Sequence, residues 1–326
     1  MRTNWDGKSK KVAGNMRKTI RNLKKIIRYL KLAVIVLACS QLPMCRNQLV
    51  DLQHMLSDAA QEQATMSQVQ SAMEVHYIDV GQGDSTLIIC SNHAMLIDAG
   101  GNDMGSRIWK YLLDQGVGTD ITLDYVIGTH GDSDHIGGMD VILTKFDCGN
   151  VFLGKSLKDT RSYEDVVNAA FYKNYKPIMP EVGSTYALGD ATFTIIAPNA
   201  EYDTENNRSI GICLQHGSNR FLFMGDAESS SEADVLESRI DISADVYKVS
   251  HHGSSTSTTD AFLQAVSPDY CVISCGLDNE YGHPHTETLD KLQAACVEIY
   301  RTDMCGTIVI ASDGECISIE TEKGIQ

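Results

Sequence analysis

Residues 129–138 of this 326-residue chain read Thr129-His130-Gly131-Asp132-Ser133-Asp134-His135-Ile136-Gly137-Gly138. They directly follow the apolar, strand-forming run 123–127, and a strand that ends in such a cluster holds its side chains on a rigid edge. Imidazoles and carboxylates without thiolates suit Zn, Mn or Fe. The segment therefore predicts a metal site, and its first candidate ligands are His130, Asp132, Asp134 and His135.

The pattern His-x-Asp-x-Asp-His-x-Gly-Gly resembles the signature of metallo-β-lactamase-fold hydrolases. Most of those proteins have His at the third position, where this chain has Asp132. The Asp variant resembles the hydrolase domain of the ComEC-type competence proteins, which take DNA into bacteria. Four more stretches match this family in its order and usual spacing, between about Met73 and the C-terminus: 79–84, 223–226, 249–254 and 281–284.

Expected strands and helices alternate along most of the chain, which predicts a layered, mixed α/β fold. The resemblance sharpens this to a four-layer αββα metallo-β-lactamase sandwich with its site along one edge. We expect strands at 74–79, 85–90, 94–98, 123–129, 191–196, 210–216, 220–224, 244–249, 270–274, 298–301, 307–311 and 315–320. We expect helices at 106–115, 136–144, 161–173, 231–239, 260–266 and 287–295.

Charge divides the chain unevenly. Residues 1–46 contain 12 Lys and Arg and one acidic residue, a net charge of +11, whereas the whole chain carries −16. The remainder therefore carries about −27 and repels nucleic-acid phosphates over most of its surface. We predict three parts: a basic, hydrophobic N-terminal signal or anchor segment (1–46), a polar connector (47–72) and a hydrolase domain (73–326).

The N-terminal segment combines a basic amphipathic stretch, 16–31, with the apolar run 32–39. This order is typical of a signal peptide or membrane anchor, although the run is shorter than the roughly 20 residues of a full span. Cys39 is a candidate lipidation site in an imperfect lipobox. We expect a membrane-anchored or secreted bacterial protein. The alternative is a cytoplasmic protein whose basic helix lies on the inner membrane face.

The resemblance implies a full set of metal ligands. Besides the four side chains in the first motif, it implies Asp226, which follows an apolar strand, and at least one of His251 and His252. Because successive residues of a strand point to opposite sides, we expect His252 to be the ligand and His251 to face the substrate. The expected cofactor is one or two divalent ions, Zn or Mn.

Other residues are expected to surround the ions. Asp134 is expected to hold or deprotonate the attacking water, and His283 to donate a proton to the leaving group. Six further side chains are expected to orient the ligands or meet the substrate: Asp79, Asp84, Asp98, Asn207, Ser209 and Tyr281.

One departure from the lactamase pattern bears on the substrate. Metallo-β-lactamases usually carry another His ligand before the strand that leads to Gly-Asp, but residues 206–211 contain none. The ligand set is therefore richer in oxygen, which shifts the metal preference from Zn toward Mn or Mg.

We therefore predict a metal-dependent hydrolase, a phosphodiesterase or nuclease that uses a metal-bound hydroxide. Its expected partners are a phosphodiester-containing small molecule or short nucleic acid, and the membrane through the N-terminal segment. No protein partner is predicted. Three alternatives stay open: a phosphorylcholine-esterase-like cell-surface hydrolase, a lactone or lactam hydrolase, and a non-catalytic binding module.

Overall fold

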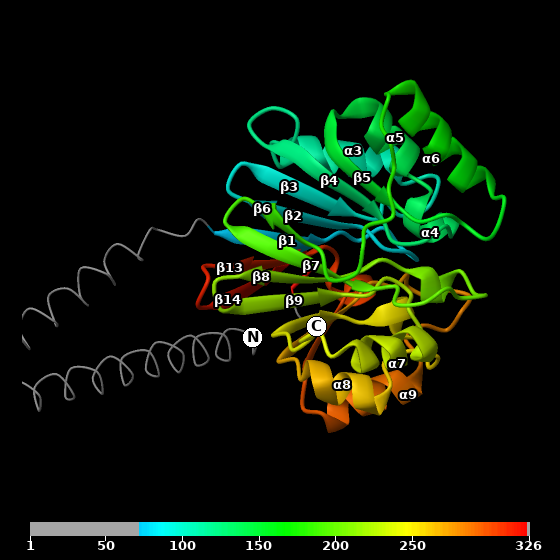
Figure 1. Ribbon diagram of the computed structural model, residues 1–326. Coiled ribbons are helices and arrows are strands. Elements are labelled where there is room, and N and C mark those ends of the chain that lie inside the picture. Colours follow the sequence, from blue (N-terminus) through cyan, green and yellow to red (C-terminus); the bar gives the residue numbers. More distant parts are fainter. Residues whose placement is uncertain (1–71, 325–326) are drawn as a thin grey trace, which may run out of the picture. The chain divides into compact units, whose positions relative to one another are not determined.

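The computed structural model describes residues 72–324, and two seven-stranded sheets face each other in its centre (Figure 1). The first sheet has the order β14 (Ile317–Thr321), β13 (Ile308–Ser312), β1 (Met73–Tyr77), β2 (Thr86–Cys90), β3 (His93–Ile97), β4 (Thr122–Gly128) and β5 (Cys148–Leu153). The second has the order β12 (Glu298–Arg301), β11 (Tyr270–Ile273), β10 (Val246–Lys248), β9 (Asn219–Phe223), β8 (Gly211–His216), β7 (Ala191–Ala197) and β6 (Thr185–Leu188).

Helices cover the outer face of each sheet (Figure 1). On the first sheet these are α3 (Gly105–Asp114), α4 (Ser133–Ile136), α5 (Met139–Lys145) and α6 (Arg161–Tyr172). On the second they are α7 (Ser229–Ser238), α8 (Asp260–Val266) and α9 (Thr286–Ala294), and the short α10 (Thr302–Cys305) follows β12. The expected four-layer αββα sandwich is confirmed.

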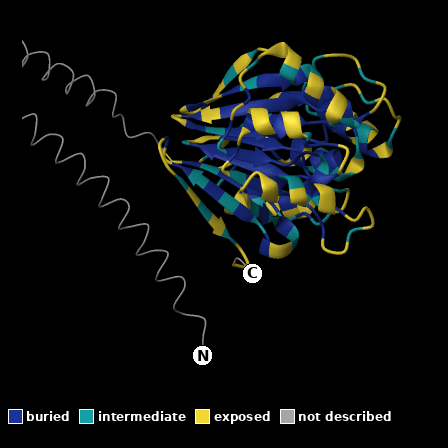
Figure 2. Ribbon diagram, turned by 90° about the horizontal axis from the view of Figure 1, so that it is seen from below, coloured by how far each residue is buried: buried dark blue, intermediate teal, exposed yellow. Residues whose placement is uncertain are grey.

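Three apolar cores hold the layers together. The central core joins the inner faces of the two sheets and includes Tyr77 and Phe223, whose rings stack at a centroid distance of 6.1 Å. The other two cores lie between each sheet and its helices. Strand β2 is buried along its whole length because both of its faces are covered. Figure 2 shows the result, with buried strands inside and exposed residues on the outer helices and loops.

The main differences from the expected elements concern one helix and two strands. The helix expected at 136–144 is two helices, α4 and α5, because the chain turns at Gly137-Gly138. Strands β5 and β6 were not expected. The sequence of β5 begins Cys148-Gly149-Asn150, a poor strand former, and β6 is a four-residue edge strand.

The predictions for the N-terminal segment concern residues that lie outside the described part of the chain. Within 72–324, no helix is both long and apolar enough to cross a membrane. The signal or anchor segment, the connector, Cys39 and the three domain boundaries therefore stay predictions. The eight cysteines in the described part of the chain are all free thiols.

The paired glycines of the first motif are required by close packing. A Cβ atom at Gly138 would lie 2.5 Å from the carbonyl oxygen of Ala99 and 2.7 Å from the backbone nitrogen of Gly105. Both neighbours are backbone atoms and cannot rotate away. The motif thus lets the metal-binding loop pack against the loop after β3.

We predict that Gly138→Ala destabilises the fold by about 2 kcal/mol, because overpacking forces the backbone to shift. Gly154→Ala is the control, since its Cβ would make only an ordinary contact of 3.5 Å with Met179. Urea unfolding of both variants measures the difference. Equal stability of the two variants would contradict this explanation of the motif.

Candidate metal centre

The expected ligands follow the carboxyl ends of strands in both sheets. His130 and His135 follow β4, whose neighbour β3 runs parallel to it. Asp226 follows β9, and His252 follows the parallel β10. Carboxyl ends of parallel strands lie at one edge of a sheet, and ligand sites favour that edge. Here the edges of two facing sheets bring the side chains together.

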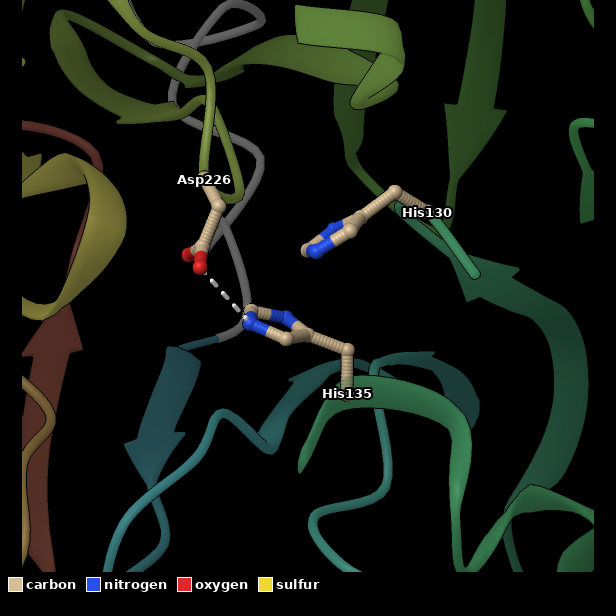
Figure 3. A group of neighbouring side chains, drawn as sticks. All are labelled: His130, His135 and Asp226. Carbon is tan, nitrogen blue, oxygen red and sulfur yellow. Dashed lines mark ion pairs between the residues drawn. The ribbon is translucent and has the colours of Figure 1, made fainter. Parts of the chain in front are cut away.

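The buried core of the site joins His135, His252 and Asp226. An Asp226 carboxylate oxygen lies 3.2 Å from His135 Nε2 and 3.4 Å from His252 Nε2. Asp134 Oδ2 lies 3.4 Å from His252 Nε2 and 3.9 Å from His135 Nε2. Figure 3 shows His130 and His135 with their rings turned toward Asp226, and the two ring centroids are 4.2 Å apart.

These side chains fit a divalent cation. No hydrogen bond reaches the buried Nε2 atoms of His130, His135 and His252, or Oδ1 of Asp226, although buried polar atoms are normally satisfied. Four sets of three side chains have ligand atoms close enough to share an ion, among them His130, His135 and Asp226, and Asp134, His135 and His252. The other two sets contain Asp84. Neutral imidazole nitrogen and carboxylate oxygen suit Zn or Mn.

Hydrogen bonds on the far side of the rings orient these ligands. His135 Nδ1 lies 2.8 Å from Asp98 Oδ2, and Asp98 also accepts hydrogen bonds from the backbone N–H and the hydroxyl of Thr129. His252 Nδ1 donates to the carbonyl oxygen of Ser274 at 3.0 Å. With Nδ1 engaged, Nε2 of each ring is left to face an ion. Asp98 is placed as the resemblance implies.

Ser209 lies in the stretch 206–211, which lacks the histidine of the lactamase pattern. Its hydroxyl lies 3.3 Å from His130 Nδ1 and accepts a hydrogen bond from the backbone N–H of Asp226. Ser209 therefore supports two candidate ligands and adds no nitrogen of its own to the centre.

The charges of the buried cluster are mutually dependent. Burial alone would lower the pKa of His135 and His252, but the Asp226 carboxylate and its acidic neighbours raise both pKa values well above the usual range. Burial alone would raise the pKa of Asp226, but the two imidazoles hold it well below its usual value. The rings are thus protonated when no ion is bound, and a cation would replace those protons.

His251 and His252 differ in environment. Both lie in a tight turn, Ser250–Gly253, with positive φ angles of 50° and 53°, and β10 ends at Lys248. The expected strand alternation is therefore wrong as the reason for their difference. His252 is 1% exposed inside the cluster. The more exposed His251 has its Nε2 3.7 Å from Asp226 and 3.3 Å from the Asn206 amide nitrogen.

Two expected site residues lie away from the metal cluster. Asp79 accepts a hydrogen bond from Gly81 N–H and pairs with Lys323, so it shapes its own turn. Asn207 Oδ1 accepts hydrogen bonds from the backbone N–H groups of Glu228 and Ser231 at the start of α7. Helix capping thus uses the amide oxygen of Asn207.

Asp132 lies at the edge of the cluster and belongs to none of the four sets of ligand atoms. One of its carboxylate oxygens lies 3.8 Å from His130 Nε2, and the other accepts a hydrogen bond from Lys158 Nζ at 3.0 Å.

Asp84 lies beside the cluster and pairs with Lys248, a residue that was not among the expected site residues. Lys248 Nζ donates to Asp84 Oδ2 at 2.8 Å, and Asp84 Oδ1 lies 3.4 Å from His252 Nδ1. Burial would raise the pKa of Asp84, but Lys248 and His252 hold it well below its usual value. The sequence signal for this pair is the position of Lys248 within an apolar strand, because a lysine buried there needs an acidic partner.

His283 and Tyr281 extend the site toward solvent. The ring of His283 is nearly parallel to those of His252 and Tyr281, at centroid distances of 6.1 Å and 5.7 Å. Burial and the neighbouring His252 and His251 lower the pKa of His283 to about 4. His283 is therefore neutral at pH 7, which does not favour the expected role as proton donor. Tyr281 is 58% exposed.

A cavity of about 380 Å³ lies against this edge of the site. It is lined by Gln82, Ser133, Asp134, Asn279, Glu280 and Tyr281. A larger cavity, of about 450 Å³, lies between α3 and the strands β13 and β14 and contains no residue of the metal cluster. The smaller cavity is the better substrate candidate because Asp134 belongs to both it and the cluster.

The chain belongs to the metallo-β-lactamase superfamily, whose family model matches residues 78–276. Its resemblance to ComEC-type competence proteins is confirmed. It is 31% identical to ComE operon protein 3 of Bacillus subtilis over 259 residues, 74% of this chain and 33% of that protein. It is also 31% identical to Recombination protein 2 of Haemophilus influenzae, covering 72% of this chain and 28% of that protein.

The chain thus spans about a third of the length of these curated relatives. Among solved structures, it is similar in fold to the metallo-β-lactamase fold protein YhfI of Bacillus subtilis. That match has a TM-score of 0.51 and 12% identity, and it covers 74% of this chain and all of YhfI.

We predict that Asp98→Asn weakens metal binding by about tenfold or more, because the charge that orients His135 is lost. Asn tolerates the positive φ of 58° at this position. The matched control is Asp79→Asn, which should leave the affinity unchanged. Equilibrium dialysis with metal analysis measures both. The assignment of Asp98 fails if the two variants bind metal equally well.

Proposed function

We propose that this protein is a metal-dependent phosphodiester hydrolase that acts on small molecules or short nucleic acids. The superfamily and the candidate metal ligands support a metal-dependent hydrolase. The observation that carries the finer proposal is the oxygen-rich composition of the site. Asp134 and Asp226 face the imidazoles, and the stretch 206–211 lacks the further histidine of the lactamase pattern.

Hard oxygen ligands favour hard cations, and phosphate oxygens are hard ligands themselves. Mn is therefore the favoured cofactor, with Zn as the alternative. When bound, a divalent ion would lower the pKa of a water molecule and neutralise charge on the phosphate oxygens. His135, His252 and Asp226 would hold it, with His130 and Asp134 at its two sides.

The protein's own groups would position the reactants. Burial opposes ionisation of Asp134, but His135 and His252 lower its pKa to about 2. Asp134 is therefore ionised at neutral pH and suited to accept a hydrogen bond from the attacking water rather than to remove its proton. His283 can donate a hydrogen bond to substrate, and the exposed ring of Tyr281 offers a flat surface for its organic part.

Charge sets a limit on the substrate. The part of the chain after residue 46 carries about −27, so binding to long duplex DNA would be weak and sensitive to salt. We propose local capture of a short or terminal phosphodiester. We also propose that the basic segment 1–46 contacts a membrane, on the evidence of its sequence alone.

The full-length protein should hydrolyse bis-(p-nitrophenyl) phosphate with Mn, and cleave short single-stranded DNA better than long duplex DNA. Asp226→Ala should reduce turnover by at least about 100-fold, because a shared ligand is lost. Asp79→Asn is the control and should retain activity. p-Nitrophenyl phosphorylcholine and chromogenic lactam and lactone substrates test the alternatives.

Robust lactam or lactone hydrolysis, without phosphodiesterase activity under any metal, would overturn the substrate proposal. Turnover by Asp226→Ala at the wild-type rate would overturn the site.

A further inference from the structure

A lysine stands beside the metal cluster on the side of Asp132. Lys158 Nζ donates a hydrogen bond to Asp132 Oδ1 at 3.0 Å, and the other oxygen of Asp132 lies 3.8 Å from His130 Nε2. The Asp132 carboxylate thus lies between the Lys158 ammonium group and His130 Nε2, a buried nitrogen without a hydrogen-bond partner. Within residues 72–324, the other lysine beside the cluster is the buried Lys248, which pairs with Asp84 behind His252.

A buried carboxylate, that of Glu205, fixes the backbone of the loop that carries Lys158. Glu205, which is 5% exposed, accepts hydrogen bonds from the backbone N–H of Gly131 at 2.8 Å and of Leu157 at 2.7 Å. It therefore fastens the loop that carries Lys158 to the metal-binding loop. The Ser156 hydroxyl bonds the carbonyl oxygen of Lys158 and strengthens the same turn. These hydrogen bonds fix the backbone of the loop that carries Lys158, although the lysine side chain itself is 59% exposed.

The packing around Gly131 also shows that the loop carrying Lys158 lies close to the metal-binding loop. A Cβ atom at Gly131 would collide with Ser156 and with the Glu205 carboxylate. Only glycine fits between His130 and Asp132, so the motif leaves room for this loop. The approach brings Lys158 to Asp132.

The pairing changes what Asp132 can do. The Lys158 side chain is an ammonium group at neutral pH, and Asp132 accepts its hydrogen bond. A carboxylate neutralised in this way has less charge to offer a metal ion. A divalent cation beside His130 and Asp132 would also be repelled by the ammonium, since both carry positive charge.

On the other side of the centre, no ion pair in the described part of the chain joins a lysine to Asp134 or Asp226. Asp134 and Asp226 approach His135 and His252 within 3.2–3.9 Å, and the acidic side chains there are available to an ion. The two halves of the centre therefore differ in charge as well as in ligand type.

We propose that the Lys158 ammonium takes the place of a second divalent ion at the Asp132 side of the centre. The protein then binds one ion tightly, among Asp134, His135, Asp226 and His252. This inference rests on the metal centre proposed above and is independent of the phosphodiester substrate.

The test measures metal stoichiometry in the full-length protein, dialysed against a fixed concentration of free Mn and analysed by mass spectrometry for metal per chain. Wild type should bind one ion. Lys158→Ala should bind a second, with an affinity at least about tenfold higher than wild type shows for any second ion. Lys158→Arg keeps the charge and should bind one.

Two controls make the result specific. Lys155→Ala removes a lysine from the same loop and should still bind one ion. The double variant Lys158→Ala/Asp132→Asn should lose the second ion that the single variant gains, because its carboxylate ligand is gone. Electron paramagnetic resonance should show spin-coupled Mn only in Lys158→Ala.

The proposal is overturned if wild type binds two ions tightly, if Lys158→Ala gains none, or if Lys155→Ala gains one. Loss of phosphodiesterase activity, without any of these results, would affect the proposed substrate alone.

Discussion

The attraction between one buried carboxylate and two imidazoles from different halves of the chain is the interaction on which this site depends. Asp226 and His252 come from the second sheet, and His135 comes from the first. Their side chains are at most 5% exposed, so none can be left with an unpaired charge. The packing of the two sheets brings them within reach of one another, and Asp226 neutralises rings that would otherwise repel. An ion would replace the protons on those rings and keep the balance.

Each ligand is oriented by a neighbour that lies farther from the ion. Asp98 and the Ser274 carbonyl hold two rings by Nδ1, and Ser209 supports His130 and Asp226 together. The centre follows several strand ends because some of them contribute ligands and others contribute the groups that orient those ligands. The same logic makes the outer residues important for metal affinity without giving them contact with substrate.

The sequence predicted the layered fold and the candidate ligands because both are local signals. Strands ending in His or Asp, and glycines that permit close packing, can be recognised along the chain. The contacts of Lys158, Lys248 and Glu205 could not be predicted, since they join residues 26 to 164 positions apart. The capping of α7 by Asn207 also joins residues that are distant in the sequence, and it becomes visible only in the folded chain.

The central claim is that His135, His252 and Asp226 share a divalent ion. Anomalous diffraction from crystals of the full-length protein grown with Mn tests it most directly, because the signal locates the ion. We predict a peak bounded by the two Nε2 atoms and the Asp226 carboxylate. A peak only at other sites, or none at Mn concentrations that support hydrolysis, would contradict the account.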